Sequence, residues 1–190
     1  MLLLARHGRT LANAQGLLQG RMDMALDDVG RLQARQLAAA LKGADVLISS
    51  PLRRAFETAE AIGPSVEIDD RWIELDFGEY DGKRREDLPD DVWARLRSDL
   101  HFAPVGGESF SALVTRVVPA LTEALERSRE DKVVIVSHVM PIKAALAIVL
   151  GVDIAVSWRC HLDQASITRM SMSDLGPVLH SFNETGHLRA

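Results

Sequence analysis

Several things that this sequence lacks narrow what the protein can be. It has one cysteine, Cys160, in 190 residues, so no disulfide can form within the chain, which fits a reducing compartment. It has no cluster of basic residues and a net charge of −5, so a nucleic-acid partner has no electrostatic footprint. It has no apolar run of about 18 residues, as a membrane span would need, and its N-terminal apolar stretch is too short for a signal peptide. We therefore expect a cytoplasmic protein that binds neither nucleic acid nor a membrane.

What the chain does have is enough apolar sequence for a substantial core. Hydrophobic residues make up 47% of it and charged residues 26%, which suits one independently folded domain over residues 1–190. Strand-like and helix-like segments alternate along the chain. This alternation predicts an α/β fold with three layers, α/β/α, around a mostly parallel central sheet.

Local patterns place the segments of this fold. Apolar runs predict three buried strands. The first begins at Leu2 and is bounded by Gly8, and the others cover 45–49 and 132–137. Helical patterns cover 28–42, 110–125 and 139–150, and a further helix is predicted with Ser50 as its N-cap and Pro51 as its first residue. Residues 164–172 and 177–183 alternate and predict an antiparallel hairpin at the sheet edge. The charged, loop-rich segment 83–107 predicts a lid insertion with one short helix around Trp93.

Two of the six histidines stand where α/β folds place their ligands. His7 directly follows the first strand, and His138 directly follows the strand over 132–137. Ligands in open α/β sheets gather outside the carboxyl ends of the strands. These two histidines are therefore the candidates for chemistry, whereas the other four are better explained as ordinary core or surface residues.

The sequence blocks around these histidines resemble the histidine phosphatase superfamily, which includes the cofactor-dependent phosphoglycerate mutases. LLLARHGRTLAN (2–13) resembles the opening signature of the family. LQGRMDMALDDVGRLQA (18–34), SSPLRRAFETA (49–59) and WIELDFGEYDG (72–82) resemble the blocks that follow, and GGES (106–109) and IVSHVMPIKAAL (135–146) complete the order. The resemblance covers nearly the whole chain, and the order of the blocks makes it specific.

The resemblance implies catalytic roles for five residues. His7 would be the nucleophile that becomes phosphorylated, and Arg6 and Arg54 would hold the phosphate. His138 matches the second active-site histidine of the family. Glu74 matches the proton donor, and the nearby carboxylates at positions 76 and 79 are the alternatives for that role.

Further residues are expected to contact the phosphate. Asn13 matches a phosphate-contacting asparagine of the family, and Gln19 is expected beside it. The helix that begins after His138 offers free N–H groups, including that of Val139, to a phosphate oxygen. Val139 and Arg9 depart from the glycine and the acidic residue that are common in the family; Arg9 either adds positive potential near the mouth of the site or is a solvated surface charge.

The chemistry of phosphoryl transfer requires these residue types, independently of the resemblance. Phosphoryl transfer depends mostly on positioning and charge neutralisation, which arginines supply without a metal or another cofactor. The attacking nitrogen of His7 must be unprotonated, which requires its other ring nitrogen to donate a hydrogen bond, and a backbone carbonyl is the expected acceptor. Arg6 and His7 can serve one phosphate only if the chain leaves strand geometry between them, and Gly8 is expected to give the backbone that freedom.

The expected function is a metal-independent phosphomonoesterase that acts on small phosphorylated metabolites through a phosphohistidine. One alternative is a cofactor-dependent phosphoglycerate mutase, and a second is a non-catalytic module that binds phosphoryl groups on the same fold. Mutases of the family carry a longer insertion over the site, so this shorter chain favours the phosphatase. No cofactor or metal is expected, the lid is expected to select the substrate, and a homodimer is left open.

Overall fold

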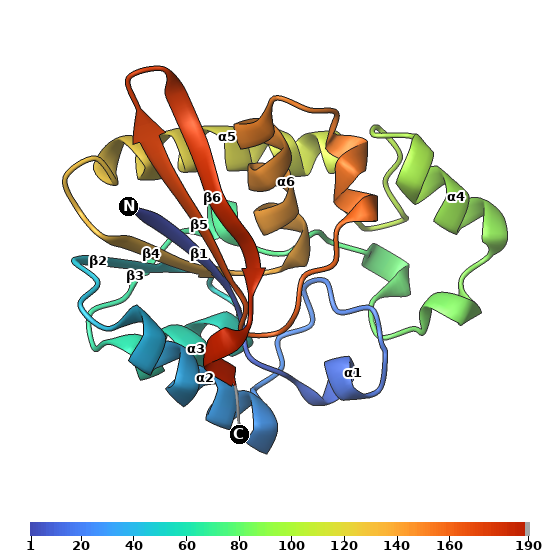
Figure 1. Ribbon diagram of the computed structural model, residues 1–190. Coiled ribbons are helices and arrows are strands. Elements are labelled where there is room, and N and C mark those ends of the chain that lie inside the picture. Colours follow the sequence, from blue (N-terminus) through green and yellow to red (C-terminus); the bar gives the residue numbers. More distant parts are fainter. Residues whose placement is uncertain (189–190) are drawn as a thin grey trace.

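A six-stranded sheet organises the computed structural model, which describes residues 1–188 (Figure 1). Its strands lie in the order β3-β2-β4-β1-β5-β6. β4 is parallel to β1 and β2, and β3 is parallel to β2, whereas β5 is antiparallel to β1 and β6. The bounds are β1 Leu2–Arg6, β2 Val46–Ser49, β3 Glu67–Ile68, β4 Val133–Ser137, β5 Ile167–Ser173 and β6 Gly176–Glu184. The mostly parallel sheet and the antiparallel hairpin at its edge are both as predicted.

Helices cover both faces of this sheet, with α5 and α6 above it and α2 and α3 below it in Figure 1. The alternation of side chains along β1 explains the layers, because Leu2 and Leu4 belong to the core under α5 and α6 whereas Leu3 and Ala5 belong to the core over α2 and α3. The helix bounds are α1 Leu11–Ala14, α2 Asp28–Leu41, α3 Arg53–Ile62, α4 Asp90–Ser98, α5 Phe110–Arg127 and α6 Val139–Leu150. The predicted three-layer α/β/α fold is confirmed.

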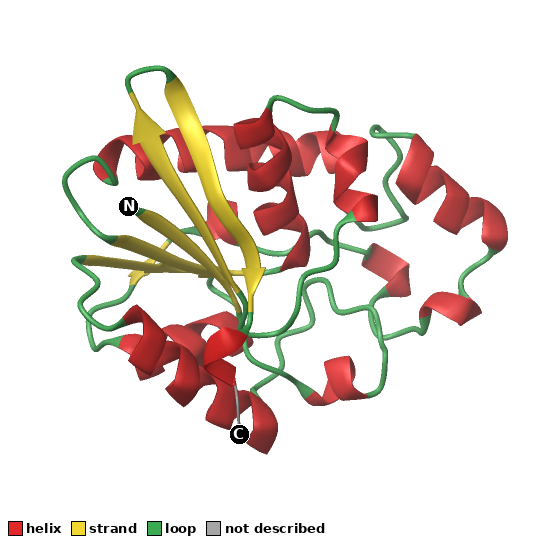
Figure 2. Cartoon of the chain, viewed as in Figure 1, coloured by secondary structure: helices red, strands yellow, loops and turns green. Residues whose placement is uncertain are grey.

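Loops and short helices gather beyond the carboxyl ends of β1 and β4, towards the right of Figure 2. The lid contributes α4, which is the short helix predicted around Trp93. It contacts the six-residue 3₁₀ helix Ile154–Arg159, here called η4, which follows α6. Within residues 1–188, no helix is both long and apolar enough to cross a membrane.

The start of α3 differs from the sequence prediction. The helix begins at Arg53, and Leu52 stands at the N-cap position without a side-chain capping bond, so Ser50 is not the N-cap. The hydroxyl of Ser50 is instead engaged elsewhere, because its Oγ lies 2.6 Å from His138 Nε2 and accepts a bond from Leu52 N. A serine that would have capped a helix thus becomes part of the site at the strand ends.

The reason for Gly8 also differs from the prediction. Its φ lies outside the left-handed region, so the backbone here does not depend on the conformational freedom of glycine. What glycine provides is space, because a Cβ at position 8 would lie 2.5 Å from the carbonyl oxygen of Gly30 in the first turn of α2. The close contact between Gly8 and Gly30 fixes the chain directly after His7.

Candidate active site

A cavity of about 210 Å³ opens beyond the ends of β1 and β4. It brings together most of the residues that the sequence singled out, from segments far apart in the chain. The polar lining is Arg6, His7, Asn13, Gln19, Glu74 and Lys143, and the apolar lining is Leu17, Leu18, Phe77, Trp93, Val139, Met140 and Trp158. Arg54 and His138 do not line it, but both contact or face His7, as described below.

His7 is held in the form that a nucleophile needs. It is 3% exposed, and its Nδ1 donates to the backbone oxygen of Gly8 at 2.7 Å, which is the bond that the sequence predicted. Nε2 is therefore an acceptor, and Arg54 Nε donates to it at 3.2 Å. Burial, followed by the charges of Arg54 and Arg6, holds the pKa of His7 well below its ordinary value. The ring is neutral, with an unprotonated nitrogen facing a cation.

Arg54 is fully buried in the first turn of α3, where backbone carbonyls fix its guanidinium. Nη1 donates to Met22 O at 2.7 Å and Nη2 to Gly20 O at 2.8 Å. This loop is fixed in turn by Asp81, whose carboxylate accepts bonds from Gly20 N and Arg21 N, each at 2.8 Å. Burial lowers the pKa of Arg54 to about 10, so the group stays charged at neutral pH. Nε is the donor aimed at His7.

Arg6 closes β1 and is 8% exposed. Its Nη1 donates to Leu162 O at 2.6 Å, and burial lowers its pKa to about 10. β1 ends at this residue and His7 lies outside the strand, so the chain does leave strand geometry where the sequence required it. Arg6 Nε is buried without a partner among the described residues.

His138 stands at the N-cap of α6, with its ring centroid 5.1 Å from that of His7. Nε2 is bonded to Ser50 Oγ at 2.6 Å, whereas Nδ1 is buried without a partner in the described chain. Burial is the largest cause of its pKa being held well below the ordinary value, followed by the charge of Arg54. The imidazole is therefore neutral in the protein alone, and its protonation in the presence of a bound phosphate stays a prediction.

The carboxylate of Glu74 lies at the N-terminus of α6. Its Oε2 accepts from Val139 N at 3.0 Å, and its Oε1 accepts from Met140 N at 3.1 Å and from Leu75 N at 2.8 Å. The N–H of Val139 is therefore not free, which corrects the expectation that it is open to a phosphate oxygen. Burial raises the pKa of Glu74, against the N–H groups and Arg54, which lower it. A buried carboxyl with a raised pKa suits a group that gives and takes a proton.

The other two carboxylates considered for this role lie outside the cavity lining. Asp76 Oδ1 accepts from Gly78 N at 2.8 Å, and Asp76 Oδ2 lies 3.5 Å from Arg21 Nε. Glu79 lies in the short 3₁₀ helix Gly78–Tyr80. Glu74 is positioned more firmly, since Ser137 at the end of β4 donates through Oγ to Trp72 O at 2.7 Å and so ties the acid segment to the sheet.

Two amides complete the polar lining. The α1 helix is capped by Thr10, whose N donates to Asn13 Oδ1 at 3.1 Å and whose Oγ1 donates to Gln19 Oε1 at 2.7 Å. Both amide oxygens are thereby used. Gln19 Nε2 is buried without a partner among the described residues, so the two amides present donors to the cavity.

Arg9 does not line the cavity. Its Nε forms an ion pair with Asp27 Oδ2 at 2.8 Å, and its side chain is 36% exposed. Of the two interpretations of this unusual residue, the structure favours a partly solvated surface charge.

Three cavity or near-cavity residues escaped sequence reasoning. Ser50 directly follows β2, so its place at a strand end was a signal that could have found it. Lys143 is the only charged residue in the apolar segment 139–150, which was a second signal. Trp158 forms an edge-to-face pair with Trp93, at 5.5 Å between ring centroids, and nothing in its local sequence indicated this contact.

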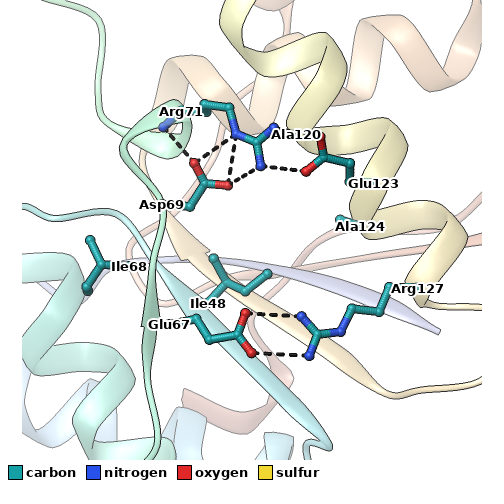
Figure 3. Close-up of a pocket in the computed structure, with 9 residues that line it drawn as sticks. All are labelled: Ile48, Glu67, Ile68, Asp69, Arg71, Ala120, Glu123, Ala124 and Arg127. Carbon is teal, nitrogen blue, oxygen red and sulfur yellow. Dashed lines mark hydrogen bonds and ion pairs between the residues drawn. The ribbon is translucent and has the colours of Figure 1, made fainter.

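A larger hollow, of about 400 Å³, lies elsewhere, where β2 and β3 meet α5 (Figure 3). Its charged groups neutralise one another. Arg71 pairs with Asp69 at 2.8 Å and with Glu123 at 2.6 Å, and Arg127 pairs with Glu67 at 3.1 Å. Because every charge that lines it has a partner, this hollow has no group that calls for a ligand.

We expect the free energy of unfolding to fall as the pH drops below about 6.5, because the unfolded chain then takes up protons on His7 and His138 while the folded protein does not. The unfolded state binds more protons, so stability rises with pH and is lost on acidification. A histidine kept fully neutral contributes about 1.4 kcal/mol per pH unit below its ordinary pKa. Glu74, with a raised pKa, acts in the opposite direction.

Urea denaturation of the wild-type protein and of His7→Ala between pH 7 and pH 5 checks this expectation. Because Glu74 is common to both proteins, the difference in slope isolates His7. The variant should show the shallower dependence on pH. Equal slopes would mean that His7 takes up a proton in the folded protein as readily as in the unfolded chain.

Comparison with known proteins identifies the family of the chain. The family model of the histidine phosphatase superfamily (branch 1) matches residues 2–185. The chain is 36% identical to phosphoserine phosphatase 1 of Hydrogenobacter thermophilus, with 98% of this chain and 93% of the relative covered. It is 32% identical to a 2,3-bisphosphoglycerate-dependent phosphoglycerate mutase of Thermoplasma acidophilum, with 93% and 89% covered.

Solved structures give the same result for the fold. Phosphoserine phosphatase from Entamoeba histolytica in complex with 3-phosphoglyceric acid superposes with a TM-score of 0.91 at 30% identity, and 99% of this chain and 98% of that chain are covered. The sequence blocks, the fold and the whole-length family match all agree. The chain therefore belongs to the histidine phosphatase superfamily, branch 1.

Proposed function

We propose that this protein hydrolyses monoesters of small phosphorylated metabolites through a phosphohistidine at His7. The observation that carries the proposal is a pair of buried donors without partners in the described chain, namely Arg6 Nε and Gln19 Nε2. Buried donors of this kind are costly to leave unsatisfied. A phosphoryl group carries several acceptor oxygens and would satisfy them around His7 Nε2.

In this proposal, His7 Nε2 attacks phosphorus in line with the departing oxygen. Arg54 Nε, which bonds to Nε2, transfers its hydrogen bond to a phosphoryl oxygen as the N–P bond forms. Glu74, protonated, gives its proton to the departing oxygen as the P–O bond breaks. Glu74 then takes a proton from water, which attacks phosphorus and releases His7 and inorganic phosphate. Positioning and charge neutralisation do most of the work in both steps.

The experiment that tests the function is a screen for released inorganic phosphate. Substrates are p-nitrophenyl phosphate and a panel of phosphorylated metabolites that includes phosphoserine and 3-phosphoglycerate, which the names and complexes of the relatives suggest. Hydrolysis of one or more of them is expected. Tight binding of phosphate without any hydrolysis would favour the non-catalytic module instead.

The mutase is a second candidate, because a mutase is among the relatives. It would return the phosphoryl group from His7 to the substrate rather than to water. With 3-phosphoglycerate and a trace of 2,3-bisphosphoglycerate, a mutase forms 2-phosphoglycerate faster than inorganic phosphate. The proposed phosphatase releases phosphate faster.

Exhaustive dialysis against a chelator is expected to leave turnover unchanged. The positive charge of the site comes from the side chains of Arg6 and Arg54, which serve without a metal ion. No group of three or more histidine, cysteine or acidic side chains within residues 1–188 could hold a metal ion. Phosphate release before and after dialysis measures the effect, and a loss that only a divalent cation restores would contradict this prediction.

A further inference from the structure

Lys143 is the one charged residue of the cavity lining that the proposed reaction does not use. It lies on α6, five residues after His138, and lines the same cavity as His7. It is 9% exposed. Its ammonium group makes no hydrogen bond or ion pair with any part of the chain that the structure describes.

The other two buried cations of the site, Arg6 and Arg54, differ from Lys143 because both donate hydrogen bonds to backbone oxygens. Arg6 donates to Leu162 O, and Arg54 donates to Met22 O and Gly20 O. The carboxylate of Glu74 also faces the cavity, but its oxygens accept backbone N–H groups. A buried cation without a hydrogen bond or ion pair is unfavourable. Burial lowers the pKa of Lys143, and the more distant charge of Glu74 only partly offsets this effect.

The fold itself does not explain a lysine at this position. α6 is apolar over most of its length, and its neighbours Ile142 and Ala144 are fully buried. A methionine or leucine would fill the same space without the desolvation of a charge. An anion that arrives with the substrate would supply the partner that Lys143 lacks in the described chain.

We propose that Lys143 binds a carboxylate of the substrate, so that the protein selects phosphorylated hydroxy or amino acids over monoesters without a carboxylate. This inference rests on the proposed function. A cavity of about 210 Å³ has room for a phosphoryl group at His7 and a chain of a few carbons. A compact ammonium with three donors suits a carboxylate at the other end.

The walls of the cavity also favour a substrate with a carboxylate at the end away from its phosphoryl group. Trp93 and Trp158 line it, and the indole N–H of each is buried without a partner among the described residues. The acid in the lining, Glu74, already accepts three backbone N–H groups, two of them at the start of α6. A substrate rich in acceptors therefore fits this cavity better than one with a second cation.

Two pairs of substrates test the proposal, because each pair differs at the carboxylate. They are 3-phosphoglycerate with glycerol 3-phosphate, and phosphoserine with phosphoethanolamine. The wild-type protein should prefer the carboxylate member of each pair in kcat/KM. Lys143→Met should reduce this preference by a factor of about 10 to 100, mainly through KM, as for the loss of one charge-assisted hydrogen bond. Lys143→Arg should retain most of it.

The control variant is Lys42→Met, which removes an exposed lysine outside the cavity and should leave the preference as in the wild type. Thermal unfolding gives a second readout. Lys143→Met should unfold at a higher temperature than the wild type, because it removes an unpaired buried charge. A lower unfolding temperature together with an equal loss of kcat/KM for both substrates of a pair would mean that Lys143 stabilises the fold. That result would overturn the proposal.

An unchanged preference in Lys143→Met, or no preference in the wild type, would also overturn it. Failure of the proposed function is separate, since it would appear as no hydrolysis of any monoester. In that case the role of Lys143 is tested by calorimetry of the binding of 3-phosphoglycerate and of glycerol 3-phosphate. Two proteins are compared, His7→Ala and the double variant His7→Ala, Lys143→Met. Tighter binding of 3-phosphoglycerate to the first protein alone would support the carboxylate site.

Discussion

His7→Ala is expected to lower kcat by a factor on the order of 10⁴ or more, as for the loss of other catalytic nucleophiles. The reason lies in the two ring nitrogens. Nδ1 is fixed as a donor to Gly8 O, and Nε2 is left as the unprotonated atom beside Arg54. No other described side chain presents such a nitrogen to the cavity. Rapid quench with ³²P-labelled substrate measures the intermediate, which should be labile in acid, stable in base and absent from the variant.

His161→Ala is the matched control, because His161 has an 80% exposed side chain and lies outside the cavity lining. It should label as the wild type does. Undiminished labelling of His7→Ala would move the nucleophile to another residue, with His138 as the first to examine.

Glu74→Gln and Arg54→Ala should slow the reaction in different ways. A general acid matters most when the departing oxygen is a poor leaving group, so Glu74→Gln should slow an alkyl phosphate severely and p-nitrophenyl phosphate much less. In the proposed reaction Arg54 acts on the phosphoryl oxygens, which all substrates share, so Arg54→Ala should slow both by a similar factor, on the order of 10² or more. The contrast between the two variants is the measured quantity.

Glutamine keeps an oxygen that can accept an N–H from the start of α6, so Glu74→Gln preserves more of the local fold than an alanine would. Asp76→Asn is the control, because Asp76 lies in the same segment but outside the cavity lining. If Asp76→Asn shows the dependence on the leaving group and Glu74→Gln slows both substrates equally, the proton donor has been misassigned. The phosphohistidine would still stand.

Sequence patterns were sufficient for the fold because its strands carry strong signals. The central strands β1 and β4 are fully buried, so apolar runs identify them without reference to their neighbours. The hairpin β5–β6 follows from alternation, and the short helix of the lid follows from the sequence around Trp93. The start of α3 was misplaced because Ser50 has a tertiary partner, His138, that local capping rules do not include.

The site was predictable in its residues but less so in its bonds. The position of His7 at a strand end and its donation to a backbone carbonyl both follow from general rules of sheets and imidazoles. The engagement of Val139 N by Glu74 could not be read from the sequence, because it depends on how residues 72–75 cross the end of β4. Lys143 stands out in the sequence as the only charge in an apolar segment, but its place beside the cavity depends on the tertiary structure.

The order of the strands has a consequence for how the protein is made. β1 pairs with β4 on one side, Leu2 opposite Val133, and with β5 on the other, Leu2 opposite Met170. On the ribosome, β1 emerges well before either partner strand has been synthesised, so both of its edges stay unpaired while more than half of the chain follows. Such distant pairing is slow and open to aggregation. The strand that leads into His7 is thus the one that waits longest for its partners during synthesis.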